Sequence, residues 1–228
     1  MPRTLYELEN VESPFVWRTK YALAHKGMAY DTQPTAFTDI AAIGDGSHQT
    51  VPMFADENGT EICDSSTIAR YLDATYPDGR PLLDAAGQAR AEEIEAIIGT
   101  QGFGGFFPLY IRDIWAGLPE KDAAYFRSTR EARFGATLEE LSANRDARLP
   151  DAQAGLDPLR AELGSHPWFC GEAPGYADYI VLAFFAWLKG CASTPPLAAD
   201  DHLVDYINRG FALYGGIGEK IKGGPIAA

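Results

Sequence analysis

Two short motifs carry residue types that could bind a small zwitterionic ligand. Val51-Pro52 precedes one short apolar run, and Asp64-Ser65 follows a second. A proline at the head of a strand has no N–H, so Val51 can offer its backbone N–H and C=O to an extended peptide alongside. Ser65 could hold a carboxylate through its hydroxyl and the N–H groups of a helix start, while Asp64 could accept from an ammonium on the same α-carbon. These motifs therefore predict a site for the free amino-acid end of a peptide.

Each motif also has a purely structural interpretation. Pro52 can simply open a strand, and Ser65 can be an ordinary residue at a helix N-terminus. Ser13-Pro14 has the same ambiguity, because Ser at the N-cap and Pro at the first helical position are a favoured pair. Ser13 lies in no GxSxG elbow and has no histidine spaced to activate it, so a hydrolase triad is not indicated.

The elements around these motifs alternate in type. Thr4–Leu8 predicts a strand, residues 13–27 predict a helix that stops at Gly27, and residues 28–34 predict a second strand. Asn58-Gly59 between two apolar runs predicts a β-hairpin, and the residues through 76 complete a further helix. The order β-α-β, loop, β-β-α is that of a thioredoxin-like domain.

The remainder of the chain has helical periodicity throughout. The Pro/Gly-rich stretch after residue 76 predicts a domain boundary, with an α/β domain over 1–80, a linker over 81–87 and an all-helical domain over 88–228. A glycine-broken aromatic segment at 102–110 is expected to interrupt or kink one helix. The other expected helices cover 90–98, 122–148, 152–163, 179–188 and 200–214.

Composition narrows the possible partners. The formal net charge of -13 makes nucleic acid and anionic membranes poor partners, and no apolar run is long enough to span a bilayer. The first ten residues contain no apolar signal-peptide core. The three cysteines and four histidines are scattered, so we expect no disulfide framework, no metal site and a cytoplasmic location.

The run SPFVWRTKYALAHKG at residues 13–27 resembles the bacterial β-etherases and the related fungal serine-type enzymes of the glutathione transferase superfamily. This resemblance implies glutathione as co-substrate, with Ser13 facing its sulfur. A hydroxyl that donates one charge-assisted hydrogen bond to a thiolate is worth about 1.5–3 kcal/mol, or roughly one to two pK units. A thiol whose pKa in free solution is about 8.5 would then be largely ionised at neutral pH.

The resemblance also assigns the remaining site residues. Residues expected to contact glutathione are Phe15, Gln49, Val51, Pro52, Asp64 and Ser65. The Val51-Pro52 bond is expected to be cis. No lysine or arginine occurs in residues 37–50, so Gln49, with His48 behind it, is the candidate for the glycine carboxylate of glutathione.

Aromatic side chains would form the wall for a second, aromatic substrate. The candidates are Phe15, Phe106, Phe107, Tyr110 and Trp115. Each of these has an equally good alternative role as part of the core between the two domains. Neither conjugation nor ether cleavage is favoured by these residues over the other.

Asp178 is interpreted as structural, because it resembles the capping aspartate of the family's folding motif. The family usually has Ser or Thr three residues earlier, where this chain has Gly175, which is still an acceptable N-cap. Two functions remain open: a catalytic glutathione transferase, or a binding or scaffold protein that keeps the fold without turnover. Intact Ser13, Val51-Pro52 and Asp64-Ser65 favour the enzyme, and the resemblance implies a homodimer.

Overall fold

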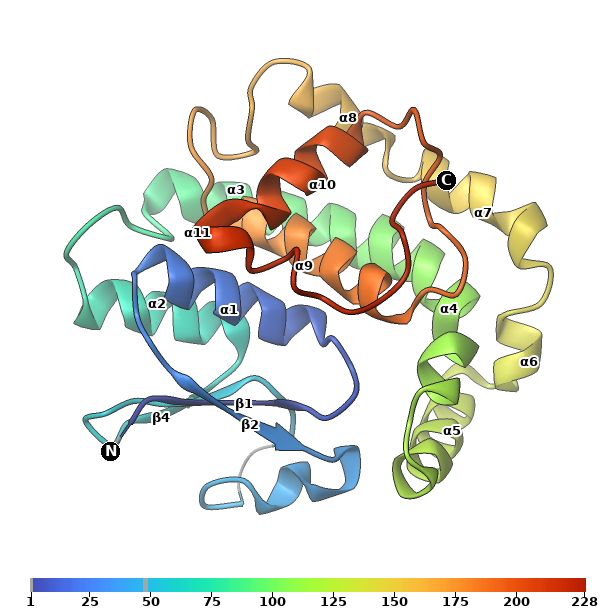
Figure 1. Ribbon diagram of the computed structural model, residues 1–228, viewed down its shortest axis with the longest axis horizontal. Helices are drawn as coiled ribbons and strands as arrows, with labels where there is room; N and C mark the ends of the chain where they lie inside the picture. Colours follow the sequence, from blue (N-terminus) through green and yellow to red (C-terminus); the bar gives the residue numbers. More distant parts are fainter. Residues whose placement is uncertain (1, 47–48) are drawn as a thin grey trace.

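The computed structural model describes residues 2–46 and 49–228. A four-stranded mixed sheet lies below α1 and α2 in the view of Figure 1. Its strand order is β2-β1-β3-β4. β1 (Thr4–Leu8) pairs in parallel with β2 (Asp31–Thr35) and antiparallel with β3 (Met53–Ala55), which forms a hairpin with β4 (Glu61–Cys63). This topology confirms the expected thioredoxin-like domain.

Two helices cover one face of this sheet. α1 (Pro14–His25) connects β1 to β2, and α2 (Ser65–Thr75) follows the hairpin (Figure 1). β2 begins later than expected, because Gly27 at φ 65 closes the end of α1 and the Met28 N–H donates to the Leu23 carbonyl at 2.9 Å. Residues 28–30 thus belong to the helix exit and not to the strand.

The rest of the chain is helical, as expected. A short 3₁₀ helix, η1 (Phe37–Ala42), follows β2, and the remaining elements come after α2. They are α3 (Ala85–Ile97), η2 (Ile98–Phe103), α4 (Gly104–Ala116), α5 (Glu120–Phe134), α6 (Leu138–Leu141), α7 (Arg145–Ala154), α8 (Asp157–Leu163), α9 (Tyr176–Cys191), α10 (Leu203–Phe211) and α11 (Leu213–Gly216).

The expectations of one helix over 122–148 and one over 152–163 were wrong, and the second is broken at Gly155 and Leu156 between α7 and α8. Gly135 adopts φ 67 and ends α5, which is a common way for a helix to stop. Thr137 then starts α6 by accepting a hydrogen bond from the Glu140 N–H, while the Glu140 side chain accepts from the Thr137 N–H. The glycine and the capping box together turn the chain back toward α4.

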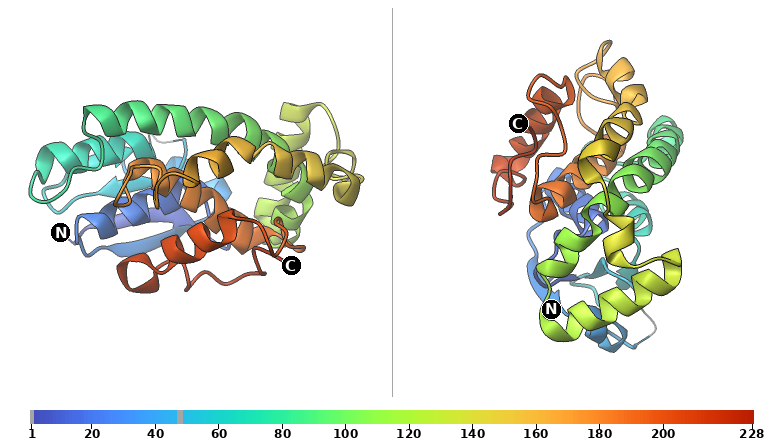
Figure 2. Two further views of the ribbon diagram at one scale, coloured as in Figure 1. Left: turned by 90° about the horizontal axis from the view of Figure 1, so that it is seen from above. Right: turned by 90° about the vertical axis from the view of Figure 1, so that its right-hand side faces the viewer.

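The glycine-rich segment between α3 and α4 stays helical but changes pitch. Over Ile98–Phe103 it forms a π helix, and Figure 2 shows the helical ribbon passing from α3 through η2 into α4 without a break. A Cβ on Gly102 would lie 3.3 Å from the Phe184 ring, so glycine allows η2 to approach α9 closely. The expected interruption of this helix is therefore a local widening.

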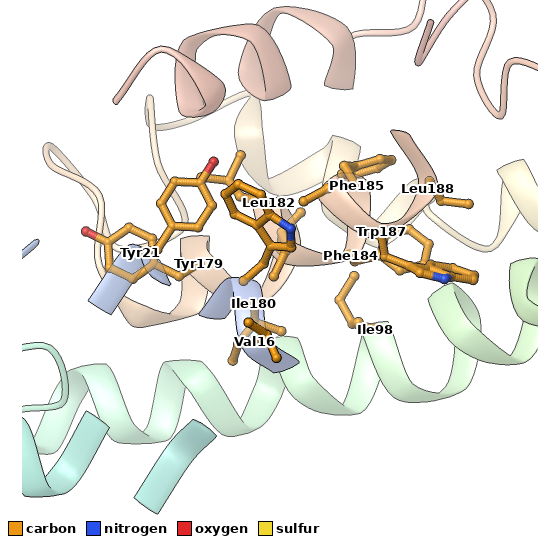
Figure 3. Close-up of a cluster of buried hydrophobic side chains, with 14 of the residues drawn as sticks. Val16, Tyr21, Ile98, Tyr179, Ile180, Leu182, Phe184, Phe185, Trp187 and Leu188 are labelled. Atoms are coloured by element: carbon orange, nitrogen blue, oxygen red, sulfur yellow. The ribbon is translucent and has the colours of Figure 1, made fainter. Parts of the chain in front are cut away.

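α9 lies at the centre of the molecule, between α1 and α3 (Figures 1 and 3). Every residue from Tyr176 to Leu188 is buried. Asp178 is fully buried, and its carboxylate accepts from the N–H groups of Phe169, Cys170 and Gly175 at 2.8, 3.2 and 2.9 Å. Burial raises the pKa of Asp178 while these donors oppose the rise, and the capping role expected for it is confirmed.

The helices of the described residues are all too short or too polar to cross a membrane.

Candidate functional site

One cavity of about 610 Å³ lies where the N-terminus of α1 meets the loop before β3, η1, η2 and the helices α4, α5 and α9. It brings together residues that are far apart in the sequence. Ser13, Phe15, Gln49, Val51 and Phe107 all line it. A volume of this size suits a small-molecule ligand.

Ser13 begins α1 through its backbone and not through its side chain. Its backbone is extended (φ -61, ψ 125), its carbonyl accepts from the Trp17 N–H at 3.0 Å, and its side chain makes no capping hydrogen bond. The residue is 7% exposed and lines the cavity. The helix-cap interpretation thus accounts for the main chain of Ser13 and leaves its hydroxyl available to a ligand.

Val51 supplies backbone polar groups beside Ser13. The Val51-Pro52 bond is cis, as expected. Val51 lies before the first residue of β3, and within residues 2–46 and 49–228 its N–H and C=O form no backbone hydrogen bond. These groups can therefore pair with a ligand backbone. Pro52 is buried and does not line the cavity.

Asp64 and Ser65 stand at the N-terminus of α2, outside the cavity walls. Asp64 adopts φ 72, which is unusual for a non-glycine residue, and its carboxylate accepts from the Thr67 N–H at 2.9 Å and the Thr67 hydroxyl at 3.0 Å. Ser65 is 1% exposed, and its hydroxyl has no hydrogen-bond partner in the described structure. The first N–H groups of α2 make this end of the helix a suitable receptor for a carboxylate.

Aromatic rings form much of the cavity wall. Phe15 is 41% exposed and stacks on Phe103 with ring centroids 6.1 Å apart. Phe103 contacts the Trp187 ring at 5.5 Å, and Phe107 lies between Trp187 at 6.0 Å and Phe134 at 5.9 Å. This wall can hold a flat apolar ligand next to Ser13.

The structure does not bring three of the expected aromatic residues to this cavity. Phe106 and Tyr110 are fully buried in the core, where the Tyr110 hydroxyl donates to the Thr194 carbonyl at 3.2 Å. Trp115 lines a separate polar cleft of about 410 Å³ and donates to the Ala123 carbonyl at 3.2 Å. Phe106 and Tyr110 therefore pack in the core, whereas Trp115 faces a different cleft.

Several cavity residues were missed by reasoning from the sequence. They are Phe37, Phe103, Tyr125, Phe126, Arg130, Arg133, Phe134 and Trp187. A signal was present in α5, because Phe126, Arg130, Arg133 and Phe134 follow the spacing i, i+4, i+7 and i+8 of a single helix face.

The remaining expectations concern the loop before Val51 and the cysteines. Gln49 lines the cavity, whereas His48 lies outside the described residues.

Burial, with the adjacent charge of Asp64, raises the pKa of Cys63 to about 11, and burial also raises that of Cys170 to about 11. Neither thiol is suited to act as a nucleophile near neutral pH.

Comparisons with known proteins agree with this architecture. The model of the glutathione S-transferase N-terminal domain matches residues 12–75, and that of the glutathione S-transferase C-terminal domain matches residues 91–195. Together they account for most of the chain. The protein belongs to the glutathione S-transferase superfamily.

Three of the similar proteins illustrate the extent of the match. Glutathione S-transferase U26 of Arabidopsis thaliana is 26% identical over 182 residues, covering 78% of this chain and 70% of the relative. A glutathione S-transferase of Ceriporiopsis subvermispora, solved in complex with glutathione, superimposes with a TM-score of 0.80 at 24% identity over 100% of both chains. Glutathione transferase GSTFuA2 from Phanerochaete chrysosporium gives a TM-score of 0.74 at 27% identity, covering 97% of this chain and 95% of that one.

Proposed function

We propose that this protein is a glutathione transferase that ionises the glutathione thiol at Ser13 and directs the thiolate at a hydrophobic aromatic electrophile. The observation that carries this proposal is the position of Ser13, whose hydroxyl is not used for capping and shares one cavity with the aromatic wall. Binding of glutathione by the Ceriporiopsis relative supports the choice of co-substrate.

The residues at the two ends of the site have separate roles in binding glutathione. The backbone of Val51, held by Pro52, pairs with the cysteinyl residue, and Phe15 covers it. Ser65 and the N-terminus of α2 hold the γ-glutamyl carboxylate, and Asp64 accepts from the γ-glutamyl ammonium. Gln49 is the donor that we assign to the glycine carboxylate.

Catalysis consists of stabilising the thiolate and holding the electrophile against it. Donation from Ser13 contributes about 1.5–3 kcal/mol, and the N-terminus of α1 adds about 0.3–1 kcal/mol. The thiolate then attacks the carbon that bears the leaving group, so that a C–S bond forms as the bond to that group breaks. With a β-aryl ether, the reaction we propose from the resemblance to the β-etherases, the electron pair leaves with the phenol oxygen, which takes a proton from solvent.

Turnover of a substrate panel tests this proposal. Purified protein with glutathione should consume an activated aryl halide or a β-aryl ether, and Ser13→Ala should slow that reaction at neutral pH. Ser128→Ala, on the exposed surface of α5, is the matched control and should leave the rate unchanged. Binding of glutathione without turnover of any member of the panel would instead identify a non-catalytic binding or scaffold protein.

We also propose that the enzyme is a cytoplasmic homodimer, as expected from the sequence. Within each subunit, we propose that residues 81–87 link the α/β domain over 1–80 to the helical domain over 88–228. Light scattering during size-exclusion chromatography tests the dimer, and limited proteolysis tests the division. A monomer at micromolar concentration, or no cleavage at the linker under conditions that cut exposed loops, would contradict these two statements.

A further inference from the structure

Two arginines line an otherwise apolar and aromatic part of the cavity. Arg130 and Arg133 lie one turn apart on α5, and no aspartate or glutamate is among the described residues that line the cavity with them. The protein has a net charge of -13, so carboxylates are abundant elsewhere on its surface. Two positive charges in a cavity wall whose described residues include no carboxylate are unusual, and their position needs a physical explanation.

Arg130 has no ion-pair partner in the part of the chain that the structure describes. Its guanidinium lies 4.7 Å from the Phe126 ring centroid and 5.6 Å from that of Phe37, and its hydrogen bond goes to the neutral Thr129 hydroxyl at 2.9 Å. Burial lowers the pKa of Arg130, and the like charge of Arg133 acts in the same direction. Partly buried charges in proteins are normally paired, because an unpaired charge loses hydration without compensation.

Arg127, three residues before Arg130 on the same helix, shows the contrast. It lies 4.4 Å from the Trp115 ring centroid and also forms ion pairs with Glu131 at 2.8 Å and Glu139 at 2.9 Å. Among the described residues, carboxylates therefore pair with Arg127, which does not line the cavity, and none pairs with Arg130.

We infer that the second substrate is an aromatic electrophile that carries an anionic group, bound by Arg130 with the help of Arg133 while its ring lies on the aromatic wall. This inference rests on the proposed transferase function and names the substrate class for the same cavity. A guanidinium suits the role, since its planar fork of donors matches a carboxylate in a bidentate pair and stacks on aromatic faces. Ser13 lines the same cavity, so the thiolate and the anion-binding group can act on one bound molecule.

The glycine carboxylate of glutathione is the other possible source of an anion near Arg130. Phe37, which packs on Arg130, begins η1, and Gln49 lies further along the same connection between β2 and β3. If Arg130 bound that carboxylate, replacing Arg130 would raise the KM for glutathione with every second substrate. Recognition of an acidic electrophile instead changes only the preference between a charged and a neutral second substrate.

A matched pair of electrophiles tests the inference. One is chlorodinitrobenzoate with chlorine para to the carboxylate, and the other is its methyl ester, which presents the same ring without the charge. In both, the thiolate forms a C–S bond at the carbon that loses chloride, and the thiol proton goes to solvent. Each kcat/KM is divided by the uncatalysed rate with glutathione, which removes the intrinsic difference in reactivity.

The wild-type protein should prefer the acid. Arg130→Met, which keeps an apolar stem against Phe126, should lower the ratio of acid to ester by roughly ten- to a hundredfold, with the KM for glutathione unchanged. Arg130→Lys should restore part of the ratio, and Arg133→Met should give a smaller loss. Arg127→Met, which removes an arginine that does not line the cavity, should leave the ratio unchanged, and thermal melting checks that each variant is folded.

The inference is overturned by an acid-to-ester ratio that does not change in Arg130→Met. It is also overturned by a higher KM for glutathione with both electrophiles, which would assign Arg130 to the glycine carboxylate. If the wild-type protein turns over neither electrophile, the proposed enzymatic function fails separately. Calorimetry with unreactive dinitrobenzoate then decides the inference: weaker binding to Arg130→Met supports it, and equal binding refutes it.

Discussion

Replacing Ser13 by alanine should raise the pKa of bound glutathione while leaving the protein folded and able to bind. The Ser13 carbonyl, and not its hydroxyl, begins the hydrogen bonding of α1, so the variant keeps the helix start. What is lost is one donor to the thiolate, worth about 1.5–3 kcal/mol. At about 1.4 kcal/mol per unit, the thiol pKa should rise by about one to two units.

Part of the stabilisation should survive in this variant. Pro14 has no N–H, but the N–H groups of Phe15 and Val16 belong to the first turn of α1 and remain directed toward its N-terminus. The helix contributes about 0.3–1 kcal/mol whether or not the hydroxyl is present. Turnover of Ser13→Ala should therefore fall most at neutral pH and recover in part as the pH is raised through the new pKa.

The assay is the ultraviolet absorbance of the bound thiolate, followed against pH for wild-type protein, Ser13→Ala and the surface control Ser128→Ala. The wild-type and control curves should coincide, and the Ser13→Ala curve should be displaced to higher pH. If all three curves overlap, Ser13 only begins a helix and the catalytic role assigned to it is wrong.

Three further predictions concern binding and stability. Ser65→Ala should weaken glutathione binding by about 1–3 kcal/mol in calorimetry, and unchanged affinity would place the γ-glutamyl end elsewhere. Asp178→Ala leaves three N–H donors without their carboxylate, so denaturant titration should show a loss of about 3–5 kcal/mol, whereas a loss below about 1 kcal/mol would contradict its capping role. Burial lowers the pKa of His25, so the unfolded chain binds the proton first, and stability should fall as the pH drops below about 6.5. Melting temperatures of His25→Gln should fall less over this range, and an equal fall in both proteins would refute the assignment to His25.

The local signals for the main elements of both domains were strong enough to predict them from the sequence. Asn58-Gly59 between apolar runs, Ser13-Pro14 at a helix start and the apolar run that became α9 each have a short-range physical cause. The errors occurred where a single residue decides whether a helix continues or ends. Gly135 ends α5, although the apolar periodicity by itself predicts a longer helix. Gly27 and Met28 form the turn that follows α1, so β2 begins later than predicted.

The two halves of the site differed in how well they could be predicted. Val51-Pro52 and Ser13 belong to contiguous motifs, so their placement follows from local order along the chain. The aromatic wall depends on how η2, α5 and α9 pack, which sequence spacing does not determine. Phe106 and Phe107 are adjacent in sequence, yet only Phe107 reaches the cavity, because successive helical residues point in different directions.

The central claim is that glutathione binds with its sulfur at Ser13, and a crystal structure of the protein with glutathione tests it most directly. The account predicts the sulfur within about 3.5 Å of the Ser13 hydroxyl, as hydrogen bonding requires, with the cysteinyl backbone paired to Val51 and a carboxylate at Ser65. Glutathione bound away from this cavity, or bound within it with its sulfur out of reach of Ser13, would contradict the claim.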